Sequence, residues 1–177
     1  MTATPRTFDM RAAGRRRAGD HVLSEQNVQS TQEKTIISGG CHCGKVTFRL
    51  AASRPPEALP VRACGCRFCR RHAALSTSDP DGRVTFAVAG PACLSRYRFG
   101  LKTADFLVCR DCGVYVGALM PDGAEAYAII NVNACDEPQR FLQNPVAMDY
   151  GAEDAAGRQA RRRAKWTPAE LQFEVIS

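Results

Sequence analysis

The sequence of 177 residues lacks an apolar run that approaches the roughly 20 residues needed by a membrane-spanning helix. It also lacks a secretory signal, because residues 1–20 contain no apolar central region. Hydrophobic residues make up 45% and charged residues 24% of the chain, a composition that excludes both a membrane protein and a wholly disordered one. We therefore expect a cytoplasmic protein without a membrane partner, long enough for one domain of ordinary size.

The sequence has too few cysteines for a disulfide scaffold, in which roughly 8–10% of residues or more are cysteine. It has nine, and an odd number fits complete disulfide pairing poorly. In the reducing compartment that we expect, thiols stay free and bind metal ions. The nine cysteines therefore favour metal binding over covalent cross-links.

A basic patch is also missing from the middle of the chain. The net charge is +6, but residues 34–157 hold 14 basic and 12 acidic side chains. Basic residues gather instead in two runs, GRRRAG at 14–19 and RQARRRAK at 158–165. The second run predicts the solvated face of a short helix, and no aromatic residues are interleaved with it. Nucleic-acid binding, which usually needs such a patch, is therefore not expected.

The composition changes near residue 34. Residues 1–33 are rich in Ala, Arg, Ser, Thr and Gln without apolar periodicity, which predicts a disordered N-terminal extension. Residues 34–177 contain short β-branched and aromatic runs bounded by Gly, Pro and Asp, and these runs predict strands. The eight predicted strands are KTIIS, KVTFRLAA, RVTFAVA, LSRYRFG, DFLVC, VYVGALM, AYAIINVN and LQFEVI.

Helical signals are confined to the end of this domain. The segment DEPQRFLQNP at 136–145 is compatible with one helical turn. The segment TPAELQ at 167–172 begins with a threonine that would cap a helix. The domain is therefore predicted to be mainly β, with a short C-terminal helical segment.

Seven of the nine cysteines fall into three clusters with the spacing of metal ligands. One or two residues between cysteines let neighbouring sulfurs face one centre, while amides of the turn donate hydrogen bonds to the thiolates. A glycine follows the second cysteine of both pairs, where chelating turns often need a positive φ. The clusters are Cys41 with Cys43, Cys64 with Cys66 and Cys69, and Cys109 with Cys112; the glycines are Gly44 and Gly113.

These ligands predict two sites, because seven thiolates divide most naturally into four and three. Zinc in tetrahedral sulfur coordination is the expected metal, giving two Zn²⁺ per chain, with an iron–sulfur centre as the alternative. The two distant pairs would close one site, which contributes folding energy. The local triplet would leave the other site open to water or substrate, as a catalytic metal requires.

The remaining cysteines and the histidines carry weaker signals. Cys93 and Cys135 stand apart, on or beside predicted strands, and are expected in the core. His42 lies between two predicted ligands and should point away from the metal. His72 follows the triplet by three residues and has three possible roles: a fourth metal ligand, a base near the open site, or an exposed loop residue.

The cysteine clusters and two further segments follow a recognisable order along the chain: GGCHCGKV at 39–46, CGCRFCRR at 64–71, FLVCRDCGVYVG at 106–117, AIINVNACD at 128–136 and KWTPAEL at 165–171. This order resembles the glutathione-dependent formaldehyde-activating (GFA) family, which includes the centromere protein V type of domain. The resemblance covers about residues 34–175 and implies a β-tent zinc fold of several short antiparallel sheets. It also implies that the two pairs hold a structural zinc and that the triplet holds a catalytic zinc.

The resemblance further implies a carbon–sulfur lyase that forms or cleaves S-(hydroxymethyl)glutathione, with glutathione and formaldehyde as its small-molecule partners. Glutathione carries a net negative charge, so Arg67, Arg70 and Arg71, with His72, are candidates for binding it. Those arginines would otherwise neutralise the anionic zinc–thiolate centre. The alternative to an enzyme is a non-catalytic zinc module that binds a small thiol, a peptide or a protein.

Overall fold

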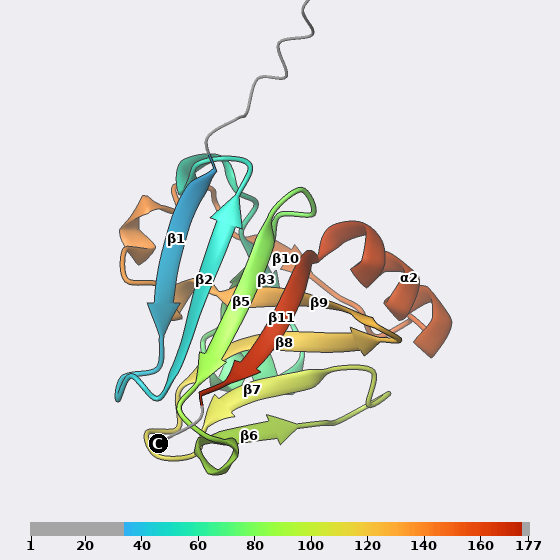
Figure 1. Cartoon of the computed structure of the whole chain (residues 1–177). Coiled ribbons are helices and arrows are strands. Elements are labelled where there is room, and N and C mark those ends of the chain that lie inside the picture. Colours follow the sequence, from blue (N-terminus) through green and yellow to red (C-terminus); the bar gives the residue numbers. More distant parts are fainter. Residues whose placement is uncertain (1–33, 175–177) are drawn as a thin grey trace, which may run out of the picture. The chain divides into compact units, whose positions relative to one another are not determined.

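Eleven strands of the described residues, 34–174, form one continuous mixed sheet in the computed structural model of this chain (Figure 1). The extension predicted at 1–33 lies outside the described residues. The sheet has two parts that meet along one strand. The first part contains, in order, β1 (Thr35–Gly40), β2 (Val46–Ala52), β5 (Arg83–Val88) and β11 (Thr167–Phe173). The second part contains, in order, β6 (Leu94–Tyr97), β7 (Asp105–Cys109), β8 (Tyr115–Asp122), β9 (Glu125–Asn131), β4 (Leu75–Thr77), β3 (Arg62–Cys64) and β10 (Val146–Met148).

Strand β11 belongs to both parts. Its first two residues, Thr167 and Pro168, pair antiparallel with β9, and residues 169–173 pair parallel with β5. In Figure 1 the strands of the first part cross those of the second at a steep angle. The two parts therefore form two layers joined by a shared strand.

The main apolar core lies between these layers, with residues from β2 and β5 on one side and from β7, β8 and β9 on the other. Strand β2 alternates buried and exposed residues, as a strand with one solvated face does, so Val46, Phe48 and Leu50 point to the core. The layers approach each other closely where Gly117 of β8 lies against the ring of Phe86 on β5.

Two α-helices and four 3₁₀ turns join the strands in the described residues. Helix α1 (Arg67–Arg71) follows β3. Helix α2 (Ala155–Lys165) begins after Asp154, whose side chain accepts a hydrogen bond from the Gly157 N–H at 2.7 Å. It ends before Trp166, which is buried in a second apolar cluster with Met120 of β8. The 3₁₀ turns span Pro56–Ala58, Pro91–Cys93, Val132–Ala134 and Pro138–Arg140.

The predicted fold class, mainly β with a short C-terminal helix, is confirmed. Each of the eight predicted strands overlaps an observed one, and most pairs are antiparallel. Two pairs, β5 with β11 and β3 with β10, are parallel and were not expected from the resemblance. The strands at 62–64, 75–77 and 146–148 are additional, because three residues are too few for alternation to show.

The predicted helix start at TPAELQ is wrong. The Thr167 hydroxyl caps no helix and instead accepts a hydrogen bond from the Asp79 N–H at 2.8 Å. Residues 169–173 pair with β5, so a contact distant in sequence overrides the local signal. The C-terminal helix forms earlier, over the basic run, and the segment at 136–145 holds its helical turn as 3₁₀.

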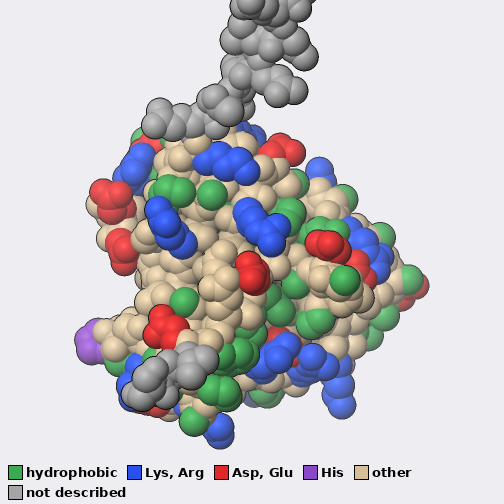
Figure 2. Space-filling view, in the orientation of Figure 1, with side chains coloured by type: hydrophobic (Ala, Val, Ile, Leu, Met, Phe, Trp, Pro, Cys, Tyr) green, Lys and Arg blue, Asp and Glu red, His purple; other side chains and the backbone are tan. Residues whose placement is uncertain are grey.

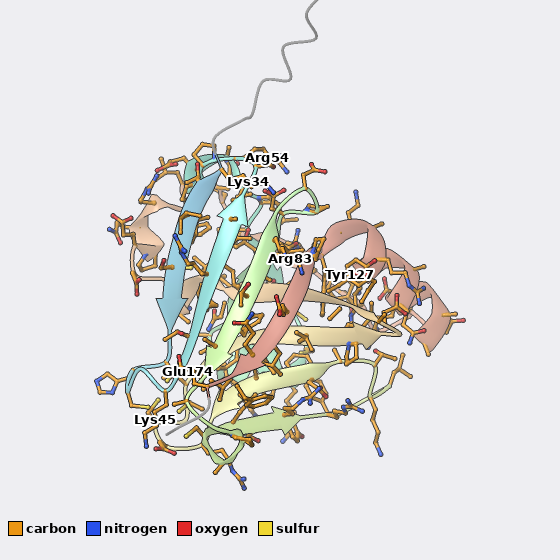
Figure 3. All side chains as sticks on the ribbon, viewed as in Figure 1. Lys34, Lys45, Arg54, Arg83, Tyr127 and Glu174 are labelled. Atoms are coloured by element: carbon orange, nitrogen blue, oxygen red, sulfur yellow. The ribbon has the colours of Figure 1, made fainter. Side chains whose placement is uncertain are left out.

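The exposed face of the first part carries charges of both signs. Figure 2 shows Lys and Arg side chains scattered among Asp and Glu over β1, β2 and β5. One such pair joins Arg83 of β5, labelled in Figure 3, to Glu170 of β11, with Nη2 and Oε2 3.8 Å apart. Within residues 34–174, no helix combines the length and the apolarity needed to cross a membrane.

Replacing Gly117 tests the close approach of the two layers. A Cβ there would lie 2.4 Å from the Ile129 carbonyl oxygen and 3.2 Å from the Phe86 ring. We expect Gly117→Ala to lower the free energy of unfolding by about 1–3 kcal/mol, because overpacking forces backbone shifts. Urea denaturation followed by circular dichroism measures this change. Gly151→Ala is the control, since its nearest neighbour is the end of the Asp149 side chain, 3.1 Å away; equal stability of both variants would contradict the packing described.

Candidate metal centres

Four cysteines from two distant turns form the first cluster. Cys41 and Cys43 lie in the turn between β1 and β2, whereas Cys109 ends β7 and Cys112 lies in the turn between β7 and β8. Their four sulfurs all lie within 4.8 Å of one another. The Cys43 sulfur is 3.6 Å from that of Cys41 and 3.5 Å from that of Cys109. The cluster therefore joins the first part of the sheet to the second.

A glycine N–H closes each turn of this cluster by a hydrogen bond to the first cysteine of the pair. The Gly44 N–H donates to the Cys41 carbonyl at 3.0 Å, and the Gly113 N–H donates to the Cys109 carbonyl at 3.0 Å. Both glycines have a positive φ, +77° for Gly44 and +74° for Gly113, as the sequence predicts for chelating turns. The Val46 N–H also donates to the Cys41 sulfur at 3.2 Å. These bonds hold each pair of sulfurs toward a common centre.

The donor set of the first cluster fits a zinc ion. A tetrahedral zinc with Zn–S distances of about 2.3 Å places its sulfurs about 3.8 Å apart, close to the separations in this cluster. Burial raises the pKa of the Cys112 thiol, but hydrogen bonds from backbone N–H groups and neighbouring thiols outweigh it and lower the pKa to about 6. An exposed ion pair between Lys45, labelled in Figure 3, and Asp111 links the same two turns.

The second cluster is built from one short segment after β3. Cys64 ends β3, Cys66 caps helix α1, and Cys69 lies within α1; their sulfurs lie within 4.8 Å of one another. The Cys66 sulfur accepts a hydrogen bond from the Cys69 N–H at 3.4 Å. The Gly65 N–H donates to the Met148 carbonyl at 2.8 Å, which fixes the segment against β10.

The three thiols of this cluster differ in acidity. A hydrogen bond with Cys69 lowers the pKa of the Cys64 thiol, and burial raises it. A further hydrogen bond from the Cys66 N–H also lowers this pKa, and the result is about 5. The same hydrogen bond and burial raise the pKa of Cys69. Burial and the charges of the three cysteines raise the pKa of Tyr115 well above its usual value, so its hydroxyl stays protonated. At neutral pH the cluster thus holds a thiolate, the form that binds metals.

All three sulfurs of the second cluster line a cavity of about 630 Å³. This volume lies within the roughly 300–1,000 Å³ of sites for small molecules. Aromatic rings form part of the lining and pack around Phe68 of α1. The ring centroid of Phe68 lies 5.2 Å from that of Phe99, 4.9 Å from that of Phe106 and 5.2 Å from that of Tyr115. The open side of the second cluster therefore faces a partly apolar space.

The basic side chains of the cavity come from α2 and β3. Arg158, Arg161 and Arg162 of α2 line it together with Arg62 of β3. The prediction that the basic run at 158–165 is a solvated face is wrong for these three residues, because they face the cavity and Arg162 is only 6% exposed. Their i, i+3, i+4 spacing places them on one helical face and is the sequence signal that identifies them.

The arginines and the histidine predicted to bind substrate lie elsewhere. Arg67, Arg70, Arg71 and His72 are exposed, and none of them lines the cavity. Within α1, the three arginines are exposed, whereas Cys69 of the triplet is buried. The His72 ring stacks 4.4 Å from that of Phe68, and its nitrogens do not join the sulfur cluster.

The remaining cysteines and His42 lie where the sequence indicates. Cys135 is 8% exposed within the main core, and Cys93 packs against that core. Burial raises the pKa of the Cys135 thiol to about 12, so it stays neutral. His42 is exposed and belongs to neither cluster. All nine cysteines are free thiols.

Comparison with known proteins identifies the family of this chain. Residues 36–150 match the model of a family described as glutathione-dependent formaldehyde-activating enzyme (GFA). The matched segment contains both cysteine clusters and ends before α2. Among solved structures, a Rhodobacter sphaeroides protein is similar at 32% sequence identity; the match covers 63% of this chain and 99% of that one, with a TM-score of 0.47.

Replacing Gly113 tests whether positive φ holds the first cluster. We expect Gly113→Ala to lower the free energy of unfolding by about 1–2 kcal/mol and to weaken metal retention, because alanine is strained at a φ of +74°. Thermal unfolding and competition with a chelator measure the two effects. Gly113→Asn is the matched control, since asparagine tolerates this conformation better, and it should recover part of the loss. An asparagine variant no better than the alanine variant would contradict the strain argument.

Proposed function

We propose, from the premise that the chain belongs to the glutathione-dependent formaldehyde-activating enzyme family, that this protein is a cytoplasmic zinc enzyme of the carbon–sulfur lyase type. The enzyme joins the thiol of glutathione to formaldehyde and also catalyses the reverse reaction. The observation that carries this proposal is the position of the triplet, whose three sulfurs line a cavity of about 630 Å³. Three thiolates leave one position of a tetrahedral metal for substrate.

The reaction is an addition without oxidation or reduction. The sulfur of glutathione forms a bond to the aldehyde carbon, the π pair of the carbonyl moves to oxygen, and the thiol proton ends on that oxygen. The product is S-(hydroxymethyl)glutathione, and the reverse step returns the thiol and the aldehyde. When bound by Cys64, Cys66 and Cys69, zinc supplies the Lewis acidity that keeps a thiol deprotonated at neutral pH.

The protein's own side chains position the reactants. Formaldehyde has two heavy atoms, so a cavity of about 630 Å³ leaves room for a tripeptide beside it. The rings of Phe99, Phe106 and Tyr115 supply an apolar surface that limits water around the sulfurs. Arginines of α2 give the cavity a positive potential, which attracts an anionic thiol.

The first cluster has a separate, structural role in this proposal. Its four thiolates complete a tetrahedral shell and leave no position for substrate. Because its sulfurs come from both parts of the sheet, metal binding there contributes to folding. Nine free thiols and a glutathione substrate both fit a reducing compartment, which supports the cytoplasmic location.

Metal analysis of variants separates the two roles. We expect two zinc ions per chain, of which the one at the triplet leaves first when a chelator is added. Cys66→Ala should lose one zinc and stay folded, whereas Cys109→Ala should unfold or aggregate because its metal supplies folding energy. Cys93→Ala, outside both clusters, is the control and should keep both ions. Freshly purified protein that contains no zinc, or only iron, would sink the proposal.

Catalysis itself is tested by exchange spectroscopy. In a mixture of glutathione and formaldehyde, the wild-type protein should speed interconversion of the thiol and S-(hydroxymethyl)glutathione above the spontaneous rate. With Cys66→Ala the interconversion should proceed only at the spontaneous rate, because the substitution removes a ligand of the open site. Binding of glutathione without faster exchange would favour the non-catalytic zinc module instead.

A further inference from the structure

Arg162 is a buried cation of the cavity that has no acidic partner among residues 34–174. It is 6% exposed, and its guanidinium lies over the Trp166 ring at 4.5 Å. Its Nη1 donates to the carbonyl and the hydroxyl of Thr103, at 3.0 and 2.8 Å. Its Nε is buried without a hydrogen-bond partner. A guanidinium so placed retains donors that the described part of the chain does not satisfy.

Arg62 is a second arginine of the cavity without an ion pair in the described residues. It lies two positions before Cys64 on β3, so both side chains lie on the same side of the strand. It donates to the Ser78 hydroxyl, which carries no charge. Burial lowers the pKa of Arg162 to about 10, so its positive charge is costly there.

The other two arginines of the cavity share one acidic partner, Glu153. The Arg161 guanidinium makes two hydrogen bonds with the carboxylate of Glu153, at 2.6 and 2.9 Å. Nε of Arg158 lies 3.4 Å from the same carboxylate. Of the acidic residues, Asp149 lines the cavity, and its Oδ1 accepts from the Gly151 N–H at 2.8 Å. Positive charge therefore exceeds negative charge among the lining side chains.

A buried cation without an acidic partner destabilises a fold, so Arg162, with the half-buried Arg62 in the same cavity, indicates a ligand that supplies the missing charge. The planar guanidinium donates two parallel hydrogen bonds, a geometry that matches a carboxylate. The three sulfurs that would hold zinc line the same cavity as both arginines. A ligand that reaches both places must therefore carry a thiol at one end and an anionic group at the other.

We propose that Arg62 and Arg162 form a carboxylate-binding subsite, which makes the enzyme selective for thiols that carry a carboxylate. The proposal rests on the proposed function and adds to it the feature of the substrate that is recognised. Selection acts on the charge of the thiol, because formaldehyde carries no charge for an arginine to recognise. Arg62 lies within the family match, whereas Arg162 of α2 lies beyond its end at residue 150.

The first experiment compares glutathione with its diethyl ester, in which both carboxylates are neutral and the thiol is intact. For the zinc-loaded wild-type protein we expect kcat/KM for exchange with formaldehyde to be at least about tenfold higher with glutathione. Calorimetric titration of each thiol without formaldehyde should show a similar preference in Kd. Arg162→Gln should bring both ratios close to one, and Arg62→Gln should lower them as well.

Arg163→Gln is the matched control, because Arg163 lies on the same helix but pairs with Asp122 outside the cavity. It should keep the wild-type ratios. Circular dichroism and zinc content establish that each variant is folded and loaded. If Arg162→Gln does not fold, the wild-type ratio and Arg62→Gln still decide the question.

The outcomes separate this subsite from the proposed function. Wild-type protein that turns over and binds both thiols equally would overturn the subsite and leave the function standing. Wild-type protein that accelerates neither reaction would overturn the function, and the titrations would then decide the subsite alone. Arg162→Gln could instead lose zinc and lower kcat/KM equally for both thiols. That result would show that the arginine only offsets the charge of the sulfur cluster, and it would overturn the proposal.

Discussion

The cluster of four cysteines ties the two parts of the sheet together. Its sulfurs come from segments that are distant in sequence, since Cys43 and Cys109 are 66 residues apart. The turn between β1 and β2 belongs to the first part, and the turn between β7 and β8 belongs to the second. The main core lies between the two parts. Strand β11 joins the parts a second time, because it pairs with both β5 and β9. Four thiols so close together repel one another when ionised, so a cation at their centre removes the main obstacle to this arrangement.

Local patterns in the sequence predict most of the fold and the sulfur clusters. Strands such as β2 are long enough for alternating burial to show, and chelating turns need only a few neighbouring residues. The three-residue strands β3, β4 and β10 are too short for such a pattern, yet β3 positions both Arg62 and Cys64. The beginning of strand β11, where the sequence predicts a helix start, also escapes prediction, because its pairing partners lie about forty and eighty residues earlier along the chain.

The charge of the cavity escapes prediction for a different reason. Proximity in sequence singles out Arg67, Arg70 and Arg71, but these side chains are exposed and do not line the cavity. Three of the four arginines that line it come from α2, about ninety residues after the triplet. Their orientation depends on Trp166, whose burial beside Met120 fixes the end of the helix. Only the tertiary packing brings these residues to the sulfurs.

The sulfurs of the cavity and its α2 arginines have separate anchors. The sulfurs depend on β3, α1 and the hydrogen bond from Gly65 to β10, whereas the α2 arginines depend on Trp166, Thr103 and Glu153. Substitutions on the inner face of α2 can therefore alter which molecules enter while leaving the reactive centre intact. A protein built in this way offers a starting point for redesign, in which one metal centre serves a series of differently charged thiols.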